Sequence, residues 1–276
     1  MLGFKNNLMV SELKEILRSF TFWTGSVMTA FLMGTQGFVA KDANAYSMKN
    51  IWEVLLLERK FPAGESFRSL ISAGHLGVYT YFIPLLASFC YLFFQAQYRR
   101  FGFERIVKIR LPKKMYRRTE YLSSLLVGGL ALTAGHFLYV MVVSILAGIR
   151  FDLFLNGSCF CYIMQTAVEA FLAGMFWNSI VYVLLHIVRN IYLLGTLPFL
   201  LKYTWGCVNN YIFMYYPSLF PKFKDLFLFF DDDGIYYIAS LGIKGSFIIG
   251  LLLLVLLINY AIPILLERRQ IDYGMY

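Results

Sequence analysis

The chain has 276 residues, of which 59% are hydrophobic, 18% aromatic and only 15% charged. Soluble domains average about 25% charged residues, so this composition excludes an ordinary soluble protein and predicts an all-α integral membrane protein. The net charge is +9, and its position along the chain decides what that charge means.

The first twenty residues predict an amphipathic helix rather than a secretion signal. Apolar residues recur at helical spacing, and the charged residues lie mostly between them. No uninterrupted apolar stretch or small-residue cleavage motif is present, so we expect no cleavable signal peptide. The helix is expected to lie in the inner membrane interface, and the alternative is a simple cytoplasmic extension of the first span. Its apolar positions are Phe4, Leu8, Met9, Leu13, Ile16, Leu17 and Phe20.

Six segments are candidates for membrane-spanning helices, each of which needs about 20 mostly apolar residues. The fourth and fifth segments carry polar residues and are separated by a short turn at Arg189. No internal repeat is present, so residues 1–276 are expected to form a single transmembrane domain. The six segments are Phe20–Ala40, Leu76–Phe94, Leu122–Leu146, Tyr162–His186, Ile191–Phe213 and Phe247–Leu266.

Two long segments are expected on the outer side of the membrane. Lys41–His75 is polar, and a helix and a loop over the outer leaflet are predicted for it. Met214–Gly242 contains an aromatic run, Leu226–Phe230, that is too short to cross the membrane and is followed by an acidic triplet. A half-inserted outer segment before the sixth span fits this pattern, since non-helical backbone enters a membrane only where protein shields it.

A basic segment joins the second and third predicted spans. Gln97–Arg118 holds nine Lys or Arg residues and one acid, Glu104. Because Lys and Arg are retained on the cytoplasmic side during insertion, this segment and both termini are predicted to be cytoplasmic. That side then holds fifteen of the 25 Lys and Arg residues and six of the 16 acids, so the entire net charge of +9 lies there. We therefore expect a multi-pass protein of a bacterial cell membrane and no nucleic-acid partner.

The sequence contains none of the common catalytic motifs. The G-x-x-x-x-G-K-[ST], H-E-x-x-H and G-x-S-x-G patterns are all absent. His75, His136 and His186 are predicted to lie on different spans and at different depths, so they do not indicate a metal or catalytic cluster. Cysteines usually behave as small buried hydrophobes, and no His cluster accompanies the four present. We expect no catalytic residue, no metal and no nucleotide site in this chain. The cysteines are Cys90, Cys159, Cys161 and Cys207.

Three polar residues inside the predicted spans are candidates for a transport pathway. Glu169 and Asn178 lie in the fourth span, and Lys202 lies in the fifth. Ionisable groups in a membrane are costly, which favours a role in lining or gating a polar pathway. In the alternative, Lys202 extends toward the interface and Glu169 already lies there.

The third predicted span carries small residues four positions apart. Such small faces let helices approach closely in lipid. They indicate either packing within one subunit, which is the more common case, or an interface with a second copy. The pairs are Ser124 with Gly128, Gly129 with Thr133, and Ala131 with Gly135.

The order of these elements resembles the membrane subunit of an ABC-2-type (type V) ABC transporter. The best match in sequence is the stretch F-E-R-I-V-K-I-R-L-P-K-K-M-Y-R-R-T-E-Y, from Phe103 to Tyr121. It is similar to the family's loop in which a short coupling helix and a basic, proline-containing stretch lead into the third span. The resemblance implies two paired membrane subunits, each docked on a separate ATPase that binds ATP and Mg.

The same resemblance implies a coupling helix from Tyr98 to Ile109 that enters a cleft on the ATPase. Its apolar residues would anchor it, and its charged residues would meet the ATPase or lipid headgroups. The alternative for the cations is attraction to anionic lipid alone, worth about 1 kcal/mol each. The coupling residues are Arg99, Arg100, Phe101, Phe103, Glu104, Arg105, Ile106, Lys108 and Ile109.

These features predict the permease subunit of an ATP-driven exporter, without enzymatic activity of its own. The fourth and fifth spans are rich in aromatic residues and Met, which suit an amphipathic or hydrophobic cargo. The resemblance favours a peptide, as in the peptide-export and antimicrobial-peptide-immunity branches of the family. The alternatives are an ion-coupled six-span carrier, with Glu169 and Lys202 as coupling charges, and a membrane-embedded lipid-modifying enzyme.

Overall fold

The computed structural model describes residues 2–35, 37–42, 45–53, 55–56, 67–75, 78–100, 112–148, 157–188, 190–216 and 243–272. Within these ranges the chain is mainly helical and contains one two-stranded sheet. In chain order the elements are α1 (Leu2–Arg18), α2 (Phe20–Gly34), β1 (Gly37–Asp42), β2 (Ala45–Asn50), α3 (Ile51–Glu53), α4 (Phe67–Gly74), α5 (Val78–Arg100), α7 (Lys113–Leu146), α9 (Gly157–Ile187), α10 (Ile191–Tyr215) and α13 (Ile243–Asp272).

Each of the six predicted spans coincides with most of one helix, namely α2, α5, α7, α9, α10 or α13. In the described part of the chain, two stretches are long and apolar enough to cross a membrane: α7, and Cys159–Ile187 in α9. The apolar stretches Tyr81–Ala96 in α5 and Leu252–Leu266 in α13 are shorter. These helices are compatible with a membrane protein.

The end of the first predicted span is wrong. Helix α2 stops at Gly34, and Gly37 begins an antiparallel hairpin in which Gly37 pairs with Asn50 and Asp42 with Ala45. A side chain at Gly34 would overlap the indole of Trp52, whose Nε1 donates a hydrogen bond of 2.8 Å to the Phe31 carbonyl. Trp52 therefore covers the end of α2, a contact between distant residues that periodicity does not reveal.

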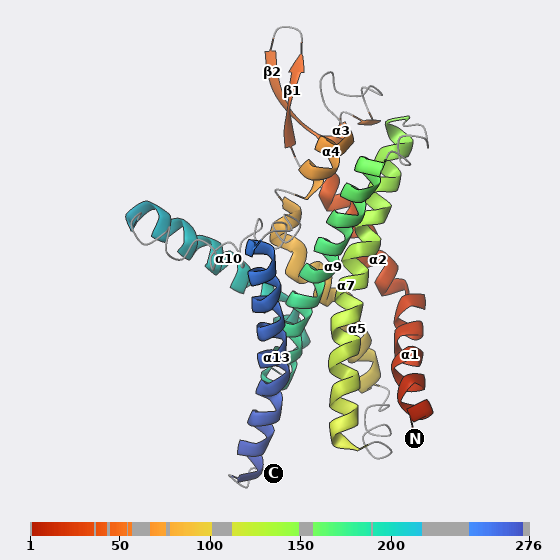
Figure 1. The fold of residues 1–276 in the computed structure, drawn as a ribbon, viewed down its shortest axis with the longest axis vertical. Helices are drawn as coiled ribbons and strands as arrows, with labels where there is room; N and C mark the ends of the chain where they lie inside the picture. The colour runs from red at the N-terminus through yellow and green to blue at the C-terminus, as the bar shows by residue number, and fades with distance from the viewer. Residues whose placement is uncertain are drawn as a thin grey trace.

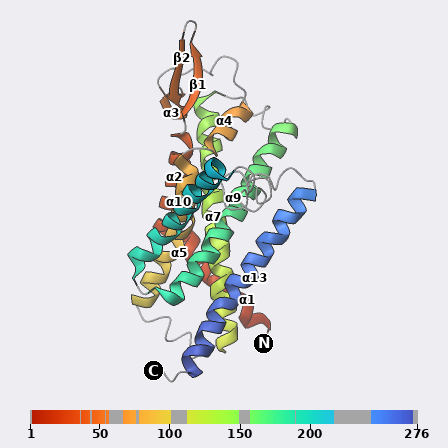
Figure 2. The ribbon, with the colours of Figure 1, turned by 90° about the vertical axis from the view of Figure 1, so that its left-hand side faces the viewer.

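The chain ends and the beginning of α7 lie at the same end of the bundle. Figure 1 shows the start of α1, the end of α13 and the start of α7 together at the bottom, while the β1–β2 hairpin projects from the top. Figure 2 shows the same arrangement from the side, with α10 leaning away from the other helices toward the viewer. We call the end that carries the two termini the basal end.

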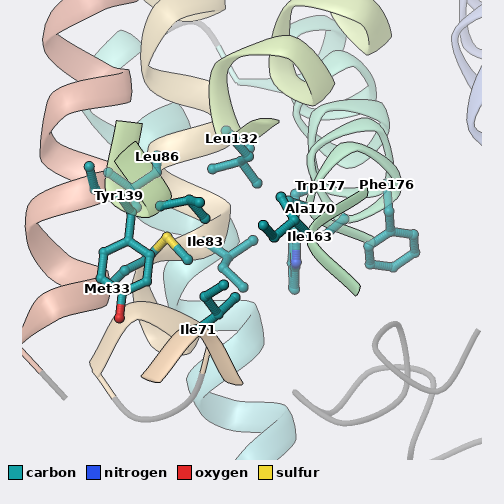
Figure 3. Close-up of a cluster of buried hydrophobic side chains, with 14 of the residues drawn as sticks. Met33, Ile71, Ile83, Leu86, Leu132, Tyr139, Ile163, Ala170, Phe176 and Trp177 are labelled. Atoms are coloured by element: carbon teal, nitrogen blue, oxygen red, sulfur yellow. The ribbon is translucent and has the colours of Figure 1, made fainter. Parts of the chain in front are cut away.

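The main core lies where α2, α4, α5, α7 and α9 meet. Figure 3 shows Met33 beside Tyr139, with Ile71 and Ile83 between them and Ala170 of α9. The Tyr139 hydroxyl donates a hydrogen bond of 2.8 Å to the Leu70 carbonyl, which ties α4 to α7. The short helix α4 is therefore part of the packed bundle.

Large apolar side chains are exposed along the outer faces of several helices. Contiguous exposed apolar surface marks contact with a membrane or a protein partner. Examples are Val27 and Phe31 on α2, Ile145 on α7, Leu200 and Tyr203 on α10, and Leu254 and Leu257 on α13.

The small residues of α7 serve contacts within this chain. A Cβ atom at Gly174 of α9 would overlap the Gly128 carbonyl of α7, so the two backbones are in direct contact. About two turns further along α7, Gly135 lies against Thr29 of α2, and the Ser26 hydroxyl donates to the Ala131 carbonyl at 3.2 Å. The prediction of packing within one subunit is confirmed for these faces.

Replacing Gly174 with Ala should separate α7 from α9. Because the obstructing atoms belong to the backbone of Gly128, a rotamer change cannot make room, and we expect a loss of about 1–3 kcal/mol in the free energy of unfolding. The matched control is Gly206→Ala in α10, where a Cβ atom has nothing within 4 Å. Unfolding in detergent micelles measures both, and equal stability of the two variants would contradict the close contact.

Candidate functional site

The basic segment spans the connection between α5 and α7 at the basal end. Arg99 and Arg100 form the end of α5, and α7 begins at Lys113. The last part of the predicted loop, Lys113–Arg118, is therefore helical, and the helix that contains the third predicted span begins at Lys113, before Leu122. The remaining coupling residues lie outside the described residues: Phe101, Phe103, Glu104, Arg105, Ile106, Lys108 and Ile109.

The first turns of α7 carry four cations, Lys113, Lys114, Arg117 and Arg118. A helix amino terminus holds the positive end of the helix dipole, so cations there are unfavourable by about 0.3–1 kcal/mol each. No acid lies in the first turn to offset them. The helix dipole therefore does not account for these four cations.

Buried hydrogen bonds join the end of α5 to the beginning of α7. The Gln95 amide donates to the Tyr91 hydroxyl at 3.0 Å, and that hydroxyl donates to the Glu120 carbonyl at 3.4 Å. The Tyr116 hydroxyl donates to the Glu120 carboxylate at 3.3 Å. We call Tyr91, Gln95, Tyr116 and Glu120 the basal polar cluster. All four are buried, so the two helices that flank the basic segment are held by contacts away from bulk solvent.

An aromatic group extends this cluster to α9 and α13. The Tyr121 ring lies 4.9 Å from the Tyr182 ring and 5.3 Å from the Tyr260 ring. The Tyr121 hydroxyl donates a hydrogen bond of 2.6 Å to the Leu256 carbonyl in α13. Three long helices, α7, α9 and α13, therefore meet around Tyr121, which directly follows Glu120 of the basal polar cluster.

Sequence reasoning missed this cluster. Its members come in pairs four residues apart, Tyr91 with Gln95 and Tyr116 with Glu120, which places each pair on one helix face. That spacing was visible in the sequence. Which helices the two faces meet depends on the tertiary packing.

The three predicted pathway residues occupy two helices. Glu169 and Asn178 lie on α9 and Lys202 on α10, and all three are buried. Glu169 is only 3% exposed and accepts a hydrogen bond of 3.4 Å from Gln165, one turn away on the same helix. This burial does not fit the alternative that placed Glu169 at an interface.

Asn178 ties α9 to α7 at the close contact between these helices. Its amide donates to the Ser124 carbonyl at 2.7 Å, and the Ser124 hydroxyl donates to the Asn178 carbonyl at 3.2 Å. The side-chain oxygen of Asn178 is buried and has no hydrogen-bond partner. Next to it, the Asn259 amide of α13 donates to the Ser179 hydroxyl at 2.7 Å. Asn178 therefore has a packing role, whether or not it also faces a pathway.

Two of the three histidines contact each other, which corrects the prediction that they lie apart. His75 follows α4, and its Nε2 lies 3.0 Å from the Nδ1 of His136 on α7. The Nε2 of His136 lies 3.2 Å from the Thr166 hydroxyl of α9. Both imidazoles are buried. The sequence does not show that α4 packs into the bundle, so it does not predict this pair.

Replacing His75 with Leu should destabilise the protein, because the buried Nδ1 of His136 would lose this partner. We expect His75→Leu and His136→Leu each to reduce the free energy of unfolding by about 1–3 kcal/mol. The double variant should lose less than the sum of the two single losses, because both substitutions remove the same contact. Unfolding in micelles gives the coupling energy. His186→Leu, near the other end of the bundle, serves as the control and should be additive with His136→Leu. Additivity of His75→Leu with His136→Leu would contradict the contact.

Helix α1 is present as predicted, and it packs against the bundle through one face. Ile16 is buried, and Glu12 accepts a hydrogen bond of 3.0 Å from the Ser123 hydroxyl of α7. Burial raises the pKa of the Glu12 carboxyl, the hydrogen bond from Ser123 opposes this rise, and the nearby charge of Glu15 adds to it. The docked helix therefore favours protonated Glu12.

Docking of α1 should weaken as the pH rises. The docked state binds more protons than the undocked state between the ordinary carboxyl pKa and the raised pKa of Glu12, so docking is strongest below this window and weaker above it. Hydrogen exchange of the α1 amides against pH measures this. Glu12→Gln should abolish the pH dependence, whereas Glu15→Gln should keep it with a smaller amplitude. An unchanged pH dependence in Glu12→Gln would exclude Glu12 as its source.

Comparisons with known proteins do not identify the chain. No protein-family model matches it, and no curated protein matches it. Among the described residues, no group of three or more His, Cys, Asp or Glu side chains could hold a metal ion. The features that bear on function are therefore the basic segment, the basal polar cluster and the buried polar residues of α9 and α10.

Proposed function

We propose that this chain is the membrane-spanning subunit of an ATP-driven exporter, related to the ABC-2-type (type V) permeases and driven by a separate ATPase. In this proposal the six long helices α2, α5, α7, α9, α10 and α13 are the spans. The basal end faces the cytoplasm of a bacterial cell, which places both termini and the basic segment on that side, in line with the charge distribution.

One observation carries the proposal: the basic segment is held between two helices that are joined inside the bundle. Any displacement of residues 101–111 acts on the end of α5 and the start of α7. The Tyr91–Glu120 hydrogen bond links those two helices, and the Tyr121 hydroxyl continues to α13. A partner that pushes on the segment can therefore move the long helices together rather than bend a loose loop.

The partner for this segment is an ATPase that binds ATP and Mg in its own chain. In this proposal an acidic docking surface on the ATPase attracts the basic segment, whose exposed cations include Lys114 and Arg118. The resemblance adds a second permease subunit, either another copy or a relative. The proposal also includes two features expected from the sequence. One is the coupling helix from Tyr98 to Ile109 with its nine coupling residues, and the other is a half-inserted outer segment before α13.

The proposed cargo is a hydrophobic or amphipathic molecule, with a peptide favoured. Phe176, Trp177 and Tyr182 of α9 are buried in the bundle, so these aromatic residues support packing. The exposed face of α10 carries Tyr203, Tyr211 and other large apolar side chains. This face offers apolar contact area to cargo at the side of the bundle, beside the buried Lys202.

An ion-coupled carrier is the second candidate, and the burial of Glu169 favours it. A carboxylate that is 3% exposed in a helix long and apolar enough to span a membrane is a natural site for a coupling proton or cation. The two candidates differ in their energy source: the carrier works without ATP, whereas the exporter requires its ATPase.

Co-purification of this chain with a candidate ATPase tests the first proposal. Combined Phe103→Ala and Arg105→Ala substitutions should weaken the complex about tenfold or more, because apolar and Arg anchors dominate such contacts. They should also reduce stimulation of ATP hydrolysis by the membrane subunit. The matched control is Arg68→Ala on α4, a cation far from the basal end that stacks on Tyr162 at 4.5 Å.

If the variant with Phe103→Ala and Arg105→Ala binds the ATPase as well as the wild type and still stimulates ATP hydrolysis fully, the assignment of these residues to ATPase coupling is wrong. Transport in vesicles that persists without the ATPase and is lost in Glu169→Gln would favour the ion-coupled carrier instead.

A further inference from the structure

Helix α1 has two faces with different partners. At 100° per residue, Glu12 and Ile16 lie on one side of the helix, and these are the residues that meet the bundle. The opposite side carries Val10 and Leu17, and Leu13 lies between the two sides. Leu13 and Leu17 are half-buried against the bundle, whereas Val10 is 56% exposed.

An open groove of about 470 Å³ runs along this second face. Its apolar surface comes from Val10, Leu13 and Leu17, and two cations, Lys14 and Arg18, line it as well. Lys14 and Arg18 are four residues apart, so they are neighbours on the helix surface, about 5–6 Å apart at Cβ. Both are exposed. Of the two acids on α1, Glu12 faces Ser123 of the bundle, and Glu15 is exposed one turn before Arg18, which leaves Lys14 and Arg18 as two cations beside one exposed acid.

We propose that this groove binds a phospholipid with an anionic headgroup. An acyl chain lies along Val10, Leu13 and Leu17, and the ammonium of Lys14 and the guanidinium of Arg18 hold the headgroup phosphate. The stems of both cations extend along apolar surface while their charges reach the polar layer, as is usual at membrane interfaces. The proposal depends on α1 alone and does not require the proposed transport function.

The arrangement of charge and apolar surface selects this ligand. Free phosphate would use the two cations and leave the apolar surface uncovered, whereas a lipid covers both. A zwitterionic lipid carries its own cation, so two neighbouring positive charges favour a lipid with net negative charge. Trp23 follows closely on α2, is half-exposed and donates its indole N–H to the Leu17 carbonyl at 3.1 Å. Trp is enriched at the headgroup level, which fits a lipid at this position.

Native mass spectrometry of the full-length protein tests the proposal. The protein is reconstituted with equal amounts of phosphatidylglycerol and phosphatidylcholine, released into detergent, and the retained lipids are counted. The wild type should retain phosphatidylglycerol preferentially. Lys14→Gln with Arg18→Gln should weaken that retention about tenfold or more, given the usual contribution of each cation near an anionic surface.

The control removes two other exposed basal cations, through Lys113→Gln with Lys114→Gln at the start of α7, and should leave phosphatidylglycerol retention within about twofold of the wild type. A third variant, Val10→Asn, should reduce retention of both lipids by removing apolar contact, without changing their ratio. Glycerol phosphate in excess should not displace the lipid, because it lacks the acyl chains.

Three outcomes would overturn the proposal. Equal retention of the two lipids by the wild type would show that the groove does not select an anionic headgroup. An equal loss of phosphatidylglycerol retention in the variant with Lys113→Gln and Lys114→Gln would show that retention depends on general surface charge and not on this groove. Failure of the wild type to retain either lipid would mean that the groove is empty or is occupied by a protein surface instead of a lipid.

Discussion

The close approach of α7 and α9 is the constraint on which the rest of the bundle depends. The two backbones touch at Gly128 and Gly174, and Asn178 and Ser124 exchange hydrogen bonds beside that contact. Because α2, α5 and α13 pack against one or both of these helices, the Gly contact sets the position of nearly every other long helix. Van der Waals contact and hydrogen bonds are the interactions that hold helices together where lipid removes the hydrophobic drive.

Polar residues inside the bundle concentrate near this central pair. The basal polar cluster lies below the Gly contact, between α5 and α7, and the His75–His136 pair joins α4 to α7 beside Thr166 of α9. Buried hydrogen-bonding groups require partners with defined geometry, so each set fixes one relative position of its helices. A bundle held at several such positions moves by shifting whole helices, which is the behaviour that the proposed transport function needs.

The basal end combines three features that belong together physically. The chain's excess positive charge is predicted there, the cations at the start of α7 oppose the helix dipole, and α1 presents Lys14 and Arg18 beside an apolar groove. An anionic membrane surface and an acidic protein partner both attract such an end. The proposed lipid site on α1 and the proposed ATPase contact at residues 98–109 use different cations of the same charged region.

The sequence by itself determined the helical class, the approximate positions of six apolar helices, the amphipathic helix α1 and the small faces of α7, because these follow from local periodicity and composition. Only the tertiary structure decided that Trp52 covers the end of α2, that His75 meets His136, and that Tyr91 meets Glu120 between α5 and α7. Each of these contacts links residues that are distant in the sequence, and helical spacing specifies which face a residue occupies but not which element that face will meet.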